Sequence, residues 1–266
     1  MANMFNRVAS RILLSIVTAA ALTMLPACVL QSADSAAQSD SQRPTGMLLD
    51  TITYNGKTHN FAVYVPREYA AGMPPSGWPV ILSLNGRGEC GLDGQRQSVV
   101  GLGSACMLQP DKYPFIIVFP QKPDADSQWI QHDQLALGCL DQVVKKYRTD
   151  PNRVYLTGLS QGGAGTWAIA AKHPARFAAI APVCGYGDAS QLASPIAAAK
   201  LPVWAFHGLK DDVVPATQSE VMVSAINAAG GNATLKLYPD ANHNSWDSAY
   251  RNENLGAWFL QHRRTP

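Results

Sequence analysis

The sequence predicts an α/β fold, in which a mostly parallel sheet has helices on both faces and an antiparallel hairpin at its N-terminal edge. Continuous apolar runs, typical of strands covered on both sides, alternate with segments of helical periodicity along most of the chain. Asn55-Gly56 separates two alternating runs near the start and is the strongest short signal for a hairpin. Residues 154–167 place a serine between glycines where a strand meets a helix. Functional side chains are therefore expected at the carboxyl ends of the strands.

The predicted elements can be assigned in chain order. The hairpin consists of residues 50–54 and 59–65, and a stretch rich in proline and glycine follows it. Further strands are expected at 80–84, 115–119, 154–157, 177–183, 202–206 and 234–238. Helices are expected at 97–108, 133–147, 163–171, 217–229 and 246–263. Asp133 is expected to cap the second helix, and Gly230-Gly231 to end the fourth.

The charge balance argues against a nucleic-acid ligand. The chain has 266 residues and a formal net charge of +2, and Arg7 and Arg11 lie in a segment that we expect to be removed. The mature protein is then close to neutral, and no basic stripe runs along it. The sequence contains neither a zinc motif nor a dinucleotide fingerprint after a strand, so we expect no metal and no cofactor.

The N-terminal segment is not expected to belong to the fold. Two arginines precede an apolar run, residues 12–25, which is short for a membrane span and typical of a secretory signal. Leu25-Pro26-Ala27-Cys28 resembles a bacterial lipobox, in which the cysteine is lipidated after cleavage. We expect a lipoprotein signal peptide at 1–27, a lipidated Cys28, a polar tether at 28–45 and a folded domain at 46–266. Secretion without a lipid anchor is the alternative.

Four cysteines remain in the folded domain, and outside the cytoplasm they can pair in three ways. Cys90 and Cys106 flank one loop-to-helix segment and are the expected disulfide. Cys139 falls in an apolar helical pattern and Cys184 at a strand end, and buried free thiols are the simpler expectation for these two.

Ser160 is the candidate nucleophile. A predicted strand precedes it, a predicted helix follows it, and Gly158 and Gly162 bracket it at the turn between them. This is the context of a nucleophile elbow, where side chains flanking the serine would collide. Such a turn exposes the hydroxyl at a helix N-terminus, where the backbone N–H of Gln161 can face a developing oxyanion. The alternative is a flexible glycine-serine loop.

A serine hydroxyl needs a base, and the base needs an acid to orient it. Among the six histidines, His243 follows the last predicted strand, where a base for such a serine belongs in chain order. The others are expected on the surface, on the flank of the sheet or in a structural turn: His59, His132, His173, His207 and His262. The acid should follow the preceding strand, where Asp211 and Asp212 are both available.

Three motifs, in this order, resemble one known superfamily. Residues 158–167 read G-L-S-x-G-G-x-G-T-W, residues 207–215 read H-G-x-x-D-x-V-V-P, and residues 243–250 read H-x-S-W-x-x-A-Y. Over about residues 46–263 the chain resembles the α/β-hydrolases, especially secreted carboxylesterases of the feruloyl-esterase and polyhydroxyalkanoate-depolymerase type and the predicted-peptidase esterases. The resemblance implies an α/β-hydrolase fold and aligns Asp211 with the acid.

The same resemblance implies an oxyanion loop after the strand at 80–84. Residues 85–91 are similar to the H-G-x-G-x-x-G loop of the superfamily, with Asn85 in place of the usual histidine. That side chain normally braces the loop rather than reacting, so catalysis can survive the change. By analogy, the backbone N–H groups of Arg87 and Gln161 form the oxyanion hole.

These features predict a serine carboxylic-ester hydrolase that works without a cofactor. Ser160 is expected to attack the ester carbonyl, His243 to take and return the proton, and Asp211 to fix the imidazole. A serine peptidase of the same fold is one alternative. A non-catalytic lipoprotein that uses the scaffold to bind a surface is the other.

The sequence says less about the substrate. The connection between the strands at 177–183 and 202–206 is too short for a helical lid, which favours bulky or polymeric acyl esters. Trp129, Tyr186 and Trp246 are candidates for an aromatic floor, with core packing as the alternative for each. We expect a monomer whose contact with a membrane is made through its lipid anchor alone.

Overall fold

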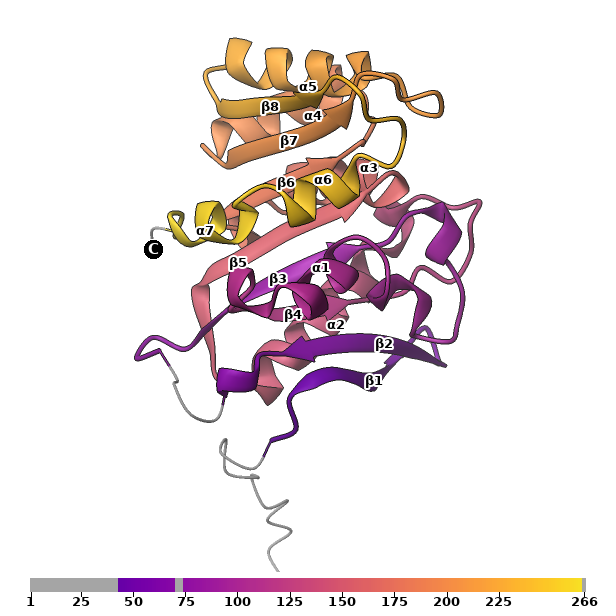
Figure 1. The fold of residues 1–266 in the computed structure, drawn as a ribbon, viewed down its shortest axis with the longest axis vertical. Coiled ribbons are helices and arrows are strands. Elements are labelled where there is room, and N and C mark those ends of the chain that lie inside the picture. The colour runs from indigo at the N-terminus through magenta and orange to yellow at the C-terminus, as the bar shows by residue number, and fades with distance from the viewer. Residues whose placement is uncertain (1–42, 70–73, 265–266) are drawn as a thin grey trace, which may run out of the picture. The chain divides into compact units, whose positions relative to one another are not determined.

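The structure is a computed structural model and describes residues 43–69 and 74–264 (Figure 1). The predicted signal peptide at 1–27, the lipidation site Cys28 and the tether up to residue 42 lie outside the described residues. Within the described residues, none of the helices has the length and apolar character needed to cross a bilayer.

Among the described residues, eight strands form one sheet in the order β1-β2-β4-β3-β5-β6-β7-β8. Their bounds are β1 Gly46–Tyr54, β2 Lys57–Val65, β3 Trp78–Leu84, β4 Ile116–Phe119, β5 Thr149–Leu159, β6 Ala179–Val183, β7 Pro202–Gly208 and β8 Asn232–Tyr238. β1 and β2 form the antiparallel hairpin, and β2 pairs antiparallel with β4. The remaining neighbours pair in parallel. The predicted α/β fold with a mostly parallel sheet is therefore confirmed.

Helices cover both faces of this sheet (Figure 1). One face carries α1 (Leu102–Leu108), α6 (Trp246–Arg251) and α7 (Leu255–Leu260), and the other carries α2 (Asp133–Lys146), α3 (Gln161–Lys172), α4 (Ala189–Ala198) and α5 (Thr217–Ala228). Strand residues alternate between the two cores, so Val80 and Leu82 face one and Ile81 the other. Short 3₁₀ helices occupy connections: η2 Arg67–Tyr69, η3 Arg87–Glu89, η4 Arg96–Ser98, η5 Pro110–Lys112, η6 Trp129–His132 and η7 Pro174–Arg176.

Two predicted helices are interrupted. The helix expected at 97–108 is split at Gly101, whose φ of +56° lies in the left-handed region. A side chain at this position would collide with the side chains of Leu159 and Tyr250. The helix expected at 246–263 is split into α6 and α7, with Asn252–Asn254 between them. Asp133 is the first residue of α2 rather than its cap, and its carboxylate pairs with Lys172 and His173.

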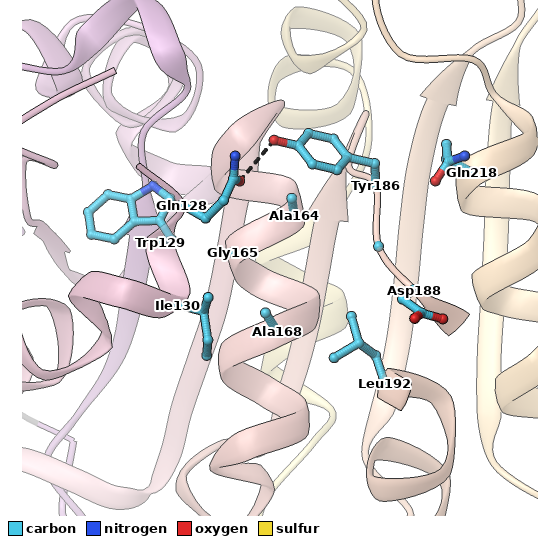
Figure 2. A pocket seen from close by; sticks show the side chains of 11 residues that line it. Gln128, Trp129, Ile130, Ala164, Gly165, Ala168, Tyr186, Asp188, Leu192 and Gln218 are labelled. Carbon is cyan, nitrogen blue, oxygen red and sulfur yellow. Dashed lines mark hydrogen bonds between the residues drawn. The ribbon is translucent and has the colours of Figure 1, made fainter. Parts of the chain in front are cut away.

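Helix α4 was not expected from the sequence. It begins after Asp188, whose carboxylate accepts a hydrogen bond from the N–H of Ser190. In Figure 2, α3 runs between the η6 segment that carries Trp129 and Ile130 on one side and Leu192 of α4 on the other. Helix α4 therefore belongs to the same layer as α3 and α5 and packs against both.

Candidate active site

Ser160 occupies the sharp corner between β5 and α3. Its backbone has φ +54° and ψ −117°, a conformation that non-glycine residues rarely adopt. The corner is packed so closely that a Cβ at Gly162 would lie 2.1 Å from the carbonyl oxygen of Leu84, and one at Gly158 would lie 2.4 Å from the carbonyl oxygen of Gly162. The two glycines are therefore required by close backbone approach, as the elbow motif predicts.

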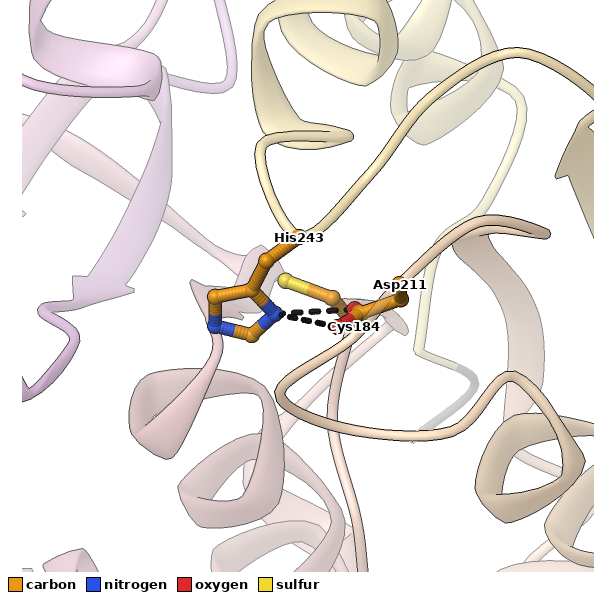
Figure 3. Close-up of side chains that lie close together, drawn as sticks. All are labelled: Cys184, Asp211 and His243. Carbon is orange, nitrogen blue, oxygen red and sulfur yellow. Dashed lines mark hydrogen bonds and ion pairs between the residues drawn. The ribbon is translucent and has the colours of Figure 1, made fainter.

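His243 lies between Ser160 and Asp211. The distance from His243 Nε2 to Ser160 Oγ is 2.9 Å, and Nδ1 lies 2.8 Å and 3.0 Å from the two carboxylate oxygens of Asp211 (Figure 3). Because an ionised carboxylate only accepts, Nδ1 carries the proton and the lone pair of Nε2 faces the serine hydroxyl. Asp212, the other candidate acid, is exposed.

The Asp211 carboxylate is fully buried and held from several sides. One oxygen accepts hydrogen bonds from the backbone N–H groups of Val213 (2.9 Å) and Val214 (2.8 Å). Burial by itself would raise the pKa of Asp211, but the hydrogen bond from His243 and the two backbone N–H groups outweigh it and lower the pKa. The carboxylate therefore stays ionised and keeps its orientation toward His243.

His207 is a further donor to the Asp211 carboxylate. Its Nε2 lies 2.9 Å from the carbonyl oxygen of Val214 and 3.1 Å from Asp211 Oδ2, so this nitrogen carries the proton and donates. Its Nδ1 lies 2.7 Å from Ser219 Oγ and accepts from that hydroxyl. Burial lowers the pKa of His207, so the ring is neutral near pH 7. The sequence suggested a structural turn at this residue; its spacing of four from Asp211 was the available signal.

The remaining histidines take part in other contacts. His132 lies 2.7 Å from Ser127 Oγ, and His173 lies 2.9 Å from the Asp133 carboxylate at the start of α2. His59 is on the hairpin and His262 follows α7. None of these four lines the cavity that contains Ser160.

A cavity of about 570 Å³ opens over Ser160 and His243. Arg87 of η3 and Gln161 at the N-terminus of α3 both line it. Gln128, Val213 and Glu89 also line it, and no sequence pattern had singled out Gln128 or Glu89. The cavity therefore brings together the serine, the histidine and the two residues expected to supply oxyanion N–H groups.

Asn85 braces the loop that carries Arg87. Its Nδ2 donates to the carbonyl oxygen of Gly86 at 2.6 Å, and its Oδ1 accepts from the N–H of Lys122 at 3.0 Å. The Nε1 of Trp129 donates to the carbonyl oxygen of Asn85 at 2.8 Å. The side chain that replaces histidine in the loop motif thus ties the loop to the segment after β4.

The three candidate aromatic residues separate into two groups. Tyr186 and Trp246 line the Ser160 cavity, and the Trp246 ring meets the His243 ring edge-on at a centroid distance of 5.5 Å. Trp129 is fully buried and does not line this cavity. Gly165 of α3 packs directly against the Trp129 side chain, and Trp129 lines a neighbouring cavity on α3 instead.

The predicted Cys90–Cys106 disulfide is absent: all four cysteines of the described residues are free thiols. Cys106 is buried in α1, where its Sγ donates to the carbonyl oxygen of Gly103 at 3.2 Å. Cys90 instead contacts Asn85 of the loop that carries Arg87, with Sγ 3.5 Å from Nδ2. The two thiols belong to different environments, the α1 core and the loop, which is why they do not pair.

Cys184 lies beside the His243–Asp211 pair (Figure 3). In the described residues, potential ligand atoms of Cys184, Asp211 and His243 lie within 4.8 Å of one another, as a metal site would require. Burial raises the pKa of the Cys184 thiol to about 12, so the thiol is protonated at neutral pH. The Sγ instead accepts the backbone N–H of Ser160 at 3.3 Å and so helps to hold the elbow.

The chain is similar to esterases in sequence. It is 29% identical over 171 residues to the bifunctional acetylxylan esterase/xylanase XynS20E of Neocallimastix patriciarum, covering 62% of this chain and 23% of that protein. It is 26% identical over 133 residues to poly(3-hydroxyalkanoate) depolymerase C of Paucimonas lemoignei, covering 45% of this chain and 30% of that protein. The chain thus spans less than a third of the length of these two curated relatives.

The fold is similar to that of a solved thermostable esterase. The TM-score is 0.71 at 28% identity, and the alignment covers 82% of this chain and 63% of that one. The profile of the dienelactone hydrolase family matches residues 117–254, which is just over half of the chain and includes Ser160, Asp211 and His243. The chain therefore belongs to the dienelactone hydrolase family of the α/β-hydrolase superfamily.

Proposed function

We propose that this protein is a carboxylic-ester hydrolase that works through an acyl-enzyme on Ser160. One observation carries the proposal: an unbroken series of hydrogen bonds links the Ser160 hydroxyl through His243 to the buried Asp211 carboxylate, beneath an open cavity. Similarity to esterases supports the reaction class.

In the proposed mechanism, Ser160 Oγ attacks the ester carbonyl while His243 Nε2 takes its proton. Asp211 stabilises the imidazolium that forms and keeps Nδ1–H in place. The N–H groups of Arg87 and Gln161 bind the developing oxyanion, and the positive end of the α3 dipole adds to this stabilisation. His243 then returns the proton to the leaving alcohol, and a water molecule repeats the sequence to release the acid.

Hydrolysis of p-nitrophenyl acetate and butyrate tests the proposal. Ser160→Ala removes the nucleophile and should abolish turnover, leaving at most the residual rate that binding and the oxyanion donors provide. Ser194→Ala is the matched control, because Ser194 is exposed on α4 and outside the cavity. Equal rates for wild type and Ser160→Ala would overturn the proposed role of Ser160.

We expect bulky or polymer-bound acyl esters as substrates. Among the described residues that line the Ser160 cavity, none comes from α4, the helix that fills the connection between β6 and β7. The relatives named above, an acetylxylan esterase/xylanase and a polyhydroxyalkanoate depolymerase, support the same class. A serine peptidase would use the same three residues, and parallel assays with matched ester and amide substrates separate the two activities.

A non-catalytic scaffold is the remaining alternative to an enzyme. A fluorophosphonate probe reacts with an activated serine and not with an ordinary hydroxyl. We expect labelling of wild type and none of Ser160→Ala, whereas an unlabelled wild type would favour a surface-binding role.

The location and assembly of the protein form a second part of the proposal. Two arginines, the apolar run at 12–25 and the lipobox-like residues 25–28 support export with lipidation of Cys28. The folded domain would then act outside the cytoplasm as a monomer held by a polar tether, with plain secretion as the alternative.

A further inference from the structure

A second cavity, of about 330 Å³, lies beside the one that contains Ser160. Its floor is one face of α3, where Ala164 and Ala168 stand one turn apart and leave space that larger side chains would fill. Ile130 of η6 forms one wall and Leu192 of α4 the opposite wall (Figure 2). The hollow therefore results from small residues on the helix that begins at the elbow.

Two residues belong to both cavities. Tyr186 and Gln128 line the Ser160 cavity as well as the second one, and the Tyr186 hydroxyl donates to Gln128 Oε1 at 2.9 Å. In Figure 2 this hydrogen bond crosses above the first turn of α3, at the level of Ala164. The two cavities therefore adjoin at this hydrogen-bonded pair, which the acyl group of a substrate at Ser160 would have to pass to enter the second cavity.

The second cavity suits an uncharged apolar group. The exposed surface of its lining is mostly apolar, and Asp188 is the one charged side chain among its described lining residues. That carboxylate is exposed and already accepts hydrogen bonds from Ser190 and Gln191, and its negative charge repels anions. An apolar protein cavity of about 150 Å³ holds benzene, so twice that volume accommodates about six to ten carbon atoms.

The position of His243 tells which end of an ester enters this cavity. The leaving alcohol oxygen must come within hydrogen-bond reach of His243 Nε2 to receive its proton. His243 and its ring neighbour Trp246 line the Ser160 cavity and are not among the residues that line the second one. The alcohol therefore departs on the His243 side, and the group on the opposite side of the carbonyl is the acyl group.

We propose that the cavity formed by α3, η6 and α4 is the acyl-binding site, selecting neutral apolar acyl groups of about six to ten carbons. The proposal rests on the proposed esterase function. Binding of such a group removes apolar surface from water, and the effect grows with each methylene that the cavity covers.

The test compares p-nitrophenyl acetate, which ends before the cavity, with p-nitrophenyl octanoate, which reaches into it. Ala168→Leu fills the floor and should lower kcat/KM for octanoate about tenfold or more, with acetate changed less than about twofold. Leu192→Ala widens the opposite wall and should shift the preference toward longer chains. Ala198→Leu, on the exposed face of α4, is the matched control and should change neither substrate.

Charge selection is tested by the mono-p-nitrophenyl ester of suberic acid, which matches octanoate in length but ends in a carboxylate. We expect wild type to prefer octanoate about tenfold or more. If Ala168→Leu lowers both esters equally, or neither, and Leu192→Ala leaves the chain-length preference unchanged, the acyl-site assignment is wrong while the esterase proposal stands. If wild type cleaves no ester, or Ser160→Ala keeps full activity, it is the esterase proposal that fails.

Discussion

Asp211 and Asp212 are adjacent in the chain but differ fully in environment. Asp211 is buried and binds His243 Nδ1 through both oxygens, whereas Asp212 is exposed. Asp211→Asn should allow the wrong imidazole tautomer and lower kcat by about four orders of magnitude, the scale known from a serine protease. Asp212→Asn is the neighbouring control and should stay within about twofold. A larger loss in Asp212→Asn would reassign the orienting carboxylate.

His207 connects the stability of the domain to pH. Burial lowers the pKa of His207 in the folded protein, whereas the same imidazole has a pKa of about 6.5 in the unfolded chain. Between these two values the unfolded state binds more protons, so this contribution to stability is present above about pH 6.5 and is lost as the pH falls toward the folded pKa.

Thermal unfolding between pH 7.5 and 5.5 measures this contribution. His207→Gln should reduce the fall in Tm across that range, even if it lowers the Tm at pH 7.5. An identical pH dependence in wild type and His207→Gln would show that His207 does not titrate on unfolding.

At the scale of elements, the strand–elbow–helix unit depends on backbone contacts that cannot move aside. A methyl group at Gly162 would meet the Leu84 carbonyl oxygen, whereas one at Gly88 in η3 would meet nothing within 4 Å. We therefore expect Gly162→Ala to lower the free energy of unfolding by about 1–3 kcal/mol or more. Gly88→Ala should stay within about 0.5 kcal/mol. Urea denaturation of both variants checks the difference, and similar losses would contradict the packing argument.

The sequence predicted the strands better than the helices, for physical reasons. Strands such as β3 are buried on both faces, so each is a continuous apolar run that needs no knowledge of its neighbours. The break at Gly101 depends on Leu159 and Tyr250, which come from distant parts of the chain. Helix α4 contains Pro195, a residue that usually ends a helix, and this obscured the capping signal of Asp188.

Site residues that belong to local sequence motifs were likewise predicted, and those that depend on contacts between distant segments were not. Ser160, Asp211 and His243 stand in motifs whose residues are close in the chain, and the structure brings these three into hydrogen-bond contact. Gln128 lies in a connection without a motif, and its bond to Tyr186 spans segments that only the fold brings together. Aromatic residues were a weak indication of a substrate-binding surface, because the same side chains occur both in buried cores and in the walls of cavities.

At the scale of the whole molecule, the proposed lipid anchor at Cys28 would determine where the proposed enzyme works. One acyl chain gives membrane binding of only about 10⁴ M⁻¹, so stable anchoring needs the several chains of a lipoprotein cysteine. The full-length protein should fractionate with membranes and resist extraction by salt, since the attachment is hydrophobic. Cys28→Ser should release it or leave it unprocessed, and Cys90→Ser is the control. A freely soluble wild type with an unmodified N-terminus would indicate plain secretion.

The unpaired cysteines have a practical consequence for making the protein. Cys90, Cys106, Cys139 and Cys184 are all reduced, so the fold of the described residues does not depend on an oxidising compartment or on an isomerase. A leaderless version can therefore be produced in the bacterial cytosol and purified in dithiothreitol. Its yield should not improve in an oxidising host strain, because the described residues form no disulfide for that strain to install.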